Sequence, residues 1–121
     1  KLLQKQLIDS DLSMAQYIHL RSLREEGALS QSELSAILGI EKASSTRVLD
    51  ELEQRQLILR ERNREDRRVV VVSLSDQGRK KIDQAMKAAR TAADRASRGF
   101  EEDELLQLFA AMDKLIGNLS S

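Results

Sequence analysis

Apolar side chains recur every three or four residues along the first half of the chain, which is the spacing of one face of a helix. Ser13 is a good N-cap for the first complete segment, and Ser30 with Glu33 has the spacing of a capping box. Gly27 and Gly39 follow the first two segments, where glycine commonly ends a helix, Gly39 in a left-handed conformation. The predicted helices and their inward residues are 14–26 (Tyr17, Leu20, Leu23), 31–38 (Leu34, Ile37, Leu38) and 42–55 (Ser45, Val48, Leu49, Leu52).

A different pattern follows, in which two β-prone runs flank a short polar link. Residues 57–62 and 67–74 are predicted to form a β-hairpin, with its tip at residues 63–66. Five arginines lie between Arg60 and Arg68. A thin hairpin with an arginine-rich tip suits a narrow anionic groove, although a charge run by itself is often only a solvated surface.

Two long helices are predicted in the second half of the chain. Ser75 is a plausible N-cap for the first, over residues 76–98, and Gly78 appears in its first turn, where glycine is tolerable. The second, over residues 101–119, begins with four acidic residues, which the helix dipole favours. Its wide apolar stripe consists of Leu105, Leu108, Phe109, Met112, Leu115, Ile116 and Leu119.

This terminal stripe has two interpretations, an intramolecular core or half of a homodimer interface. The chain has few aromatic residues and little mass with which to cover so wide a stripe. We therefore favour the homodimer. Leu3 and Leu7 are spaced as the end of an amphipathic helix over residues 1–8, which would join the interface, and we expect further residues upstream of Lys1.

Composition and charge narrow the function. The net charge is zero, but residues 60–68 form a local basic patch, which is what groove binding requires. The sequence has no cysteine, so disulfides and thiolate chemistry are excluded. No apolar run approaches a membrane span and no signal peptide is visible, so we expect a cytoplasmic protein with no membrane partner.

The order of these elements indicates the fold. A short helix, a tight glycine turn and a longer helix form a helix-turn-helix, in which the second helix enters the major groove of DNA. The hairpin follows as a wing. We therefore predict a mainly α protein with a small β-hairpin wing, a winged helix-turn-helix with dimerisation helices at both ends.

The sequence resembles the multiple-antibiotic-resistance regulator (MarR) family of winged-helix transcription factors. The matching segments are Gln31-Ser32-Glu33-Leu34-Ser35 with Leu38-Gly39-Ile40, the helix Lys42 to Leu52, and the wing signature from Asp66 to Gly78. The resemblance covers nearly all of the chain. It implies a DNA-binding lobe over residues 14–75 and dimerisation helices over residues 1–8 and 76–121.

Two positions depart from the family pattern. Ser45 replaces an aliphatic residue on the buried side of the recognition helix, where its hydroxyl could bond back to a carbonyl one turn earlier. Gln56 replaces a glycine after that helix, and we expect it to adopt a left-handed conformation at a modest energetic cost.

The candidate DNA contacts lie on the recognition helix and the wing. Short side chains at the start of the recognition helix allow it to sit deep in the major groove, and its free N–H groups favour phosphate. The resemblance places Asp66 and Arg68 as a pair, with the aspartate orienting the arginine into the minor groove. We expect Arg64 in the minor groove as well. The other wing arginines should supply affinity and salt dependence, with Arg62 and Arg67 either at phosphates or pointing to solvent. The candidates are Lys42, Ala43, Ser44, Thr46 and Arg47 on the helix, and Arg62, Arg64, Asp66, Arg67 and Arg68 in the wing.

We therefore predict a dimeric, sequence-specific transcriptional regulator, most simply a repressor that binds a pseudo-palindromic operator in double-stranded DNA. The alternative is a protein–protein interaction module or an architectural DNA-binding factor with low specificity. We find no catalytic cluster and no metal or cofactor motif, so we expect no enzyme. The resemblance implies a small aromatic or phenolic effector, for which Tyr17 and His19 are weak candidates. A lone histidine in a helix is more often structural.

Overall fold

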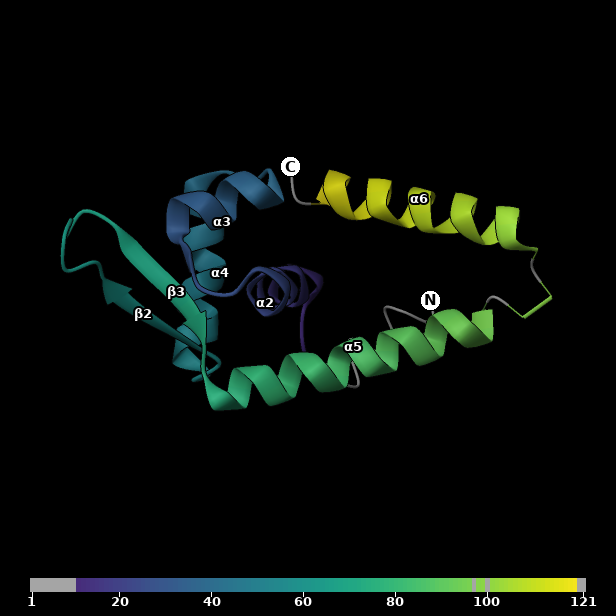
Figure 1. Ribbon diagram of the computed structural model, residues 1–121, viewed down its shortest axis with the longest axis horizontal. Coiled ribbons are helices and arrows are strands. Elements are labelled where there is room, and N and C mark those ends of the chain that lie inside the picture. The colour runs from purple at the N-terminus through teal and green to yellow at the C-terminus, as the bar shows by residue number, and fades with distance from the viewer. Residues whose placement is uncertain (1–10, 97, 100, 120–121) are drawn as a thin grey trace.

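The computed structural model describes residues 11–96, 98–99 and 101–119 of the chain (Figure 1). It is mostly helical with one small antiparallel sheet, and this confirms the predicted fold class. The predicted helix over residues 1–8, with Leu3 and Leu7, lies outside the described residues. The elements are α2 (Met14–Glu26), β1 (Leu29–Ser30), α3 (Gln31–Leu38), α4 (Lys42–Gln54), β2 (Ile58–Arg62), β3 (Val70–Leu74), α5 (Asp76–Ala96) and α6 (Glu102–Leu119).

Local side-chain chemistry explains where the first helices begin. The Ser13 hydroxyl accepts a hydrogen bond from the Gln16 amide, and the Gln16 side chain accepts one from the Ser13 amide, so α2 starts with a full capping box. The predicted box of Ser30 and Glu33 at α3 is also present. Gly39 adopts the left-handed conformation at φ 68°, which makes the tight turn into α4.

The sheet contains one strand that the sequence pattern did not predict. Its order is β1-β3-β2, with β3 in the centre. Leu29 pairs with Val72 and Ser30 with Val71, so β1 contributes only two residues. A strand of this length is too short to show alternation. It ties the start of α3 to the base of the wing.

The core of the lobe lies where α2, α4, α5 and the sheet meet. Its fully buried members include Leu20, Leu34, Leu49, Leu52, Ile58, Val72 and Ile82. The prediction that Ile37 faces inward was wrong, because its side chain is 54% exposed. The buried face of α3 passes instead through Leu34 and Ser35, with Leu38 half-buried.

The helix α5 leads away from this lobe, and α6 runs back towards it (Figure 1). The α5 helix packs on the lobe through Ile82 and Ala85, while Ile116 near the end of α6 packs against the core. The rest of the α6 stripe is less covered. Leu108, Met112 and Ile116 are half-buried, whereas Leu106, Phe109, Leu115 and Leu119 are exposed; the side chain of Leu105 lies outside the described part. No helix in the described ranges combines the length and apolar character of a membrane span.

His19 has a structural position in this core. Its side chain is fully buried between α2 and α4. Nδ1 lies 2.7 Å from the Ala15 carbonyl oxygen, which can only accept a hydrogen bond, so Nδ1 carries the proton of the neutral ring and donates it. Nε2 therefore accepts a hydrogen bond of 3.0 Å from the Ser45 hydroxyl. The expectation that Ser45 bonds a carbonyl one turn earlier was therefore wrong. The hydroxyl instead satisfies a buried ring nitrogen of another helix.

This buried histidine makes stability depend on pH. Burial lowers the pKa of His19 below its ordinary value, and the bond to Ala15 offsets this only in part. Below pH 6.5 the unfolded chain binds a proton that the folded chain resists, so stability should fall as the pH drops from 7 towards the lowered pKa. We expect the melting temperature to decline between pH 7 and 5.5, and to decline less in His19→Gln. Parallel curves for the two proteins would contradict this.

Candidate nucleic-acid interface

The recognition helix α4 presents a small and open N-terminal turn. Glu41 occupies the N-cap without bonding a backbone amide through its side chain, so the first N–H groups lack a side-chain cap. Of the predicted contact residues, Lys42, Ala43, Ser44 and Arg47 are exposed and Thr46 is half-buried. Three of the four residues predicted to face inward on α4 are buried, namely Ser45, Leu49 and Leu52, and the fourth, Val48, is half-buried.

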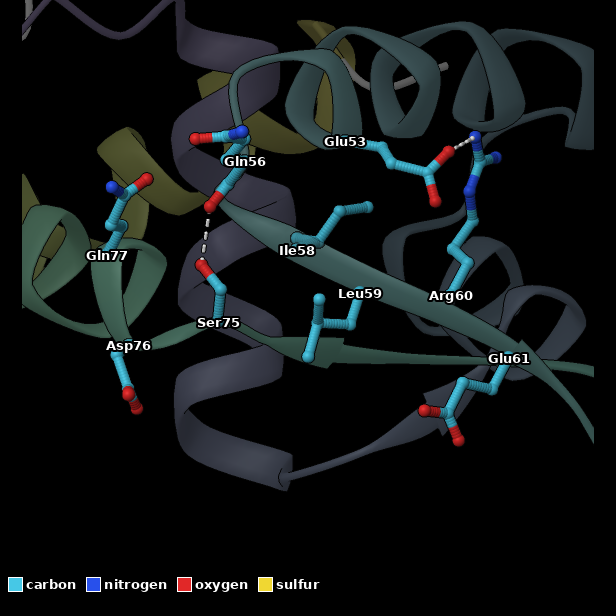
Figure 2. A pocket seen from close by; sticks show the side chains of 9 residues that line it. All are labelled: Glu53, Gln56, Ile58, Leu59, Arg60, Glu61, Ser75, Asp76 and Gln77. Atoms are coloured by element: carbon cyan, nitrogen blue, oxygen red, sulfur yellow. Dashed lines mark hydrogen bonds and ion pairs between the residues drawn. The ribbon is translucent and has the colours of Figure 1, made fainter.

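A left-handed residue connects α4 to the wing. Gln56 has φ 63°, which confirms the left-handed conformation predicted for the residue that replaces the family's glycine. Its carbonyl accepts a hydrogen bond of 2.6 Å from the Ser75 hydroxyl (Figure 2). The same hydroxyl accepts a hydrogen bond of 2.9 Å from the Gly78 amide. Ser75 thus caps α5, as predicted, and also joins this cap to the turn at the base of the wing.

The wing tip is longer than predicted, because β3 begins at Val70. The Asn63 side chain accepts hydrogen bonds from the amides of Glu65 and Asp66, at 2.8 Å and 3.3 Å, and so shapes the loop. Arg67 and Arg68 therefore lie in a turn and not in the strand that was predicted over residues 67–74.

Asp66 and Arg68 form the expected pair. The Arg68 Nε and Nη2 atoms donate to the two carboxylate oxygens at 3.0 Å and 3.1 Å. The Arg68 amide donates to the same carboxylate, which fixes it further. These bonds hold the pKa of Asp66 below its ordinary value. The Arg68 side chain remains 90% exposed, so a pre-oriented guanidinium faces solvent at the wing tip.

The other wing arginines differ from one another. Arg64 and Arg67 are exposed, and the Arg62 guanidinium donates to the Arg67 carbonyl at 2.8 Å. Arg60 was expected to add affinity for DNA as part of the basic run, but its side chain is turned inward and is only 16% exposed. Its guanidinium donates to the Asp50 and Glu53 carboxylates of α4. The sequence pattern does not predict these bonds, because periodicity and short motifs carry no information on contacts between separate elements.

Two of the cavities beside these elements have similar volumes. One, of about 510 Å³, is at the base of the wing and is lined by Glu53, Gln56, Ile58, Leu59, Arg60, Glu61, Ser75, Asp76 and Gln77 (Figure 2). The other, of about 520 Å³, is lined by Met14, Ala15, Ile18, His19, Ile40, Glu41, Ser44, Val48 and Leu119. His19 lines this second cavity but Tyr17 does not, so the two effector candidates do not share it.

Comparisons with known proteins agree with this geometry. Residues 12–70 match the model of the MarR family. The HTH-type transcriptional repressor MdtR of Bacillus subtilis is 34% identical over 93 residues, which cover 77% of this chain and 60% of the relative. This chain thus spans about three fifths of the length of that curated relative.

Solved structures share the fold over nearly the whole chain. The YusO protein of Bacillus subtilis superposes with a TM-score of 0.75 at 30% identity, over 94% of this chain and 81% of that one. A mutant of E. coli MarR complexed with operator DNA superposes with a TM-score of 0.80 at 26% identity, over 94% and 82%. With its helix-turn-helix, its wing and these matches, the chain belongs to the MarR family.

Proposed function

We propose that this chain is a sequence-specific DNA-binding transcriptional regulator, a repressor that acts as a homodimer on a pseudo-palindromic operator in the cytoplasm. The wing tip is the observation that carries the proposal. There the Arg68 side chain is 90% exposed, yet one edge of its guanidinium, formed by Nε and Nη2, is held by Asp66. The wing projects from the end of the molecule opposite to the α5–α6 turn (Figure 1). A fixed cation on a thin projection fits the narrow, negative minor groove.

The recognition helix would occupy the adjacent major groove. The exposed side chains of Lys42, Ala43 and Ser44 allow close approach, and the uncapped N–H groups of this turn favour a phosphate. Arg47 could donate two hydrogen bonds to a guanine, and Thr46 could contact a phosphate or a thymine methyl group. Arg64 would reach the minor groove beside Arg68, and Arg62 and Arg67 would add phosphate contacts from the wing.

Dimerisation would use the uncovered apolar side of α6. Phe109, Leu115 and Leu119 are exposed in the single chain, in a helix with a continuous apolar stripe. A second copy related by two-fold symmetry would bury them. The interface residues proposed are Leu3, Leu7, Leu105, Leu108, Phe109, Met112, Leu115, Ile116 and Leu119. Two recognition helices would then be spaced by about 34 Å, one turn of DNA.

The cavity beside His19 is the proposed effector site. Met14, Ile18 and Val48 make it largely apolar, and Glu41 and Ser44 belong to the start of the recognition helix. A small aromatic or phenolic ligand held there would press on the turn that enters the major groove and so shift the chain towards a form that releases DNA. Glu41 is the one charged residue in its lining, so a neutral phenol should bind better than an aromatic anion.

Specificity for a DNA sequence is the decisive measurement. A duplex selected by the protein from a randomised pool should bind about a thousandfold or more tightly than a scrambled duplex at the same salt concentration. Addition of phenol should release the selected duplex, and benzoate, the matched aromatic anion, should release it less well at the same concentration. A ratio near one would contradict the regulator and favour an architectural factor or a protein-binding module. Release by neither compound would contradict only the effector site.

A further inference from the structure

Arg60 connects the wing to both helices of the helix-turn-helix. It lies on β2, and its Nη2 atom is 2.6 Å from Asp50 Oδ1 and 2.7 Å from Glu53 Oε1, both on α4. Its Nη1 atom donates to Gln31 Oε1, at the first residue of α3, at 3.2 Å. Figure 2 shows the Arg60 side chain reaching from β2 to Glu53. One guanidinium thus holds three elements at defined distances.

The partners are arranged so that only an arginine fits them well. Asp50 and Glu53 are three residues apart, about one helical turn, so their carboxylates lie on the same side of α4. A planar guanidinium can donate to both carboxylates and to the Gln31 amide oxygen at once, whereas a lysine ammonium is a point charge on a flexible stem. These bonds raise the pKa of Arg60, with Glu53 as the largest cause.

Stability alone is a weak explanation for this network. The side chains of Asp50 and Glu53 are 62% and 45% exposed, and ion pairs with such solvent access contribute little to folding. The location is more informative. Asp50 and Glu53 belong to the recognition helix, where uncompensated carboxylates would repel the phosphates of bound DNA. β2 carries the wing that ends in Arg68.

We propose that Arg60 is a positioning residue for DNA binding, which holds the wing and the recognition helix in one arrangement and offsets part of the negative charge of two carboxylates of that helix. It does not contact DNA itself. Its effect on affinity therefore passes through Asp50 and Glu53. This inference rests on the proposed function, because it requires both elements to engage one duplex.

The test is Arg60→Gln, measured on the duplex that the wild-type protein selects from a randomised pool. We expect affinity for this duplex to fall by about tenfold, because residues that share one hydrogen-bond and ion-pair network are commonly coupled by a free energy of this size. A lost phosphate contact lowers the slope of log affinity against log salt by about 0.9, whereas a positioning residue should leave this slope nearly unchanged. Arg60→Lys keeps the charge and should give an intermediate loss; it also serves as the test if Arg60→Gln fails to fold.

A second background separates action through the carboxylates from any other route. In the chain that carries Asp50→Asn and Glu53→Gln, the Arg60→Gln substitution should cost clearly less affinity than in the wild-type chain. Equal costs in both backgrounds would overturn the proposal. Unchanged affinity in the wild-type background, or a salt slope reduced by a full phosphate contact, would also overturn it.

Arg24→Gln is the matched control. Arg24 also joins two elements through a carboxylate, with its Nε atom 2.8 Å from Asp83 on α5, but it lies on α2, outside the proposed DNA contacts. Its loss should leave affinity unchanged, and an equal loss in both variants would overturn the specific role of Arg60. If the wild-type protein selects no duplex, the proposed function fails and this inference fails with it. Selection followed by an unaffected Arg60→Gln variant removes only the inference.

Discussion

Replacing Gly78 with alanine is expected to destabilise the protein by about 3 kcal/mol, at the upper end of the usual cost of overpacking. A Cβ atom at this position would lie 1.8 Å from the Leu57 carbonyl oxygen and 2.8 Å from its carbon. Both are backbone atoms, and the same oxygen accepts a hydrogen bond of 3.1 Å from the Ser75 amide. The contact cannot be relieved by a side-chain rotation, so the α5 start or the base of the wing must move.

Gly117→Ala in α6 is the matched control, because a Cβ there meets nothing within 4 Å. Glycine to alanine inside a helix normally stabilises by up to about 1 kcal/mol, so the two substitutions should have opposite signs. The free energy of unfolding from urea titration measures both. If both substitutions changed stability equally, or if Gly78→Ala had no effect, then the close approach of Leu57 would not be the reason for a glycine at position 78.

Arg68→Ala is expected to reduce affinity for the selected duplex by ten- to hundredfold, which corresponds to about 1–3 kcal/mol for one directed contact. The folded state should be unaffected, because the Arg68 side chain is 90% exposed. Asp66→Asn keeps the guanidinium but weakens the bonds at 3.0 Å and 3.1 Å that orient it, and should give a smaller loss. Gel-shift titration of all variants at one salt concentration measures these effects.

Arg67→Ala provides the comparison for Arg68→Ala. Arg67 is exposed in the same turn, and we propose only a phosphate contact for it. Its loss should weaken selected and scrambled duplexes alike, whereas loss of Arg68 should lower the ratio between them. Unchanged affinity in Arg68→Ala would remove the minor-groove role of the wing and leave the recognition helix as the reader of sequence.

Local chemistry explains why much of the fold was predictable. A capping box such as Ser30 with Glu33 acts over three residues, and Gly39 meets a conformational need of its own backbone, so both leave a direct trace in the sequence. The pairing of Asp66 with Arg68 also acts within a few residues. The wing signature around this pair was therefore the clearest motif in the sequence, and the bonds between the Arg68 guanidinium and the Asp66 carboxylate have the predicted arrangement.

Features that depend on distant contacts could not be predicted in this way. Ile37 fits the inward spacing of its helix, yet it is exposed, because whether a neighbour covers a given helix face depends on packing and not on periodicity. The strand β1 exists only through its pairing with β3. Gly78 looked merely tolerable in the first turn of a helix until the approach of Leu57 showed that it is required.

The sequence by itself determined the order of the helices and the hairpin, the starts of the helices, the turn of the helix-turn-helix and the presence of the arginine-rich wing, since short-range bonding and the apolar period encode these. The tertiary structure alone decided that Arg60 is withdrawn from the exposed arginines of the wing. Arg68 is held outward by a neighbour two residues away, whereas Arg60 is drawn inward by Asp50, Glu53 and Gln31, which are 10, 7 and 29 residues distant. In the sequence both are members of one basic run, and only folding brings the carboxylates that separate their roles.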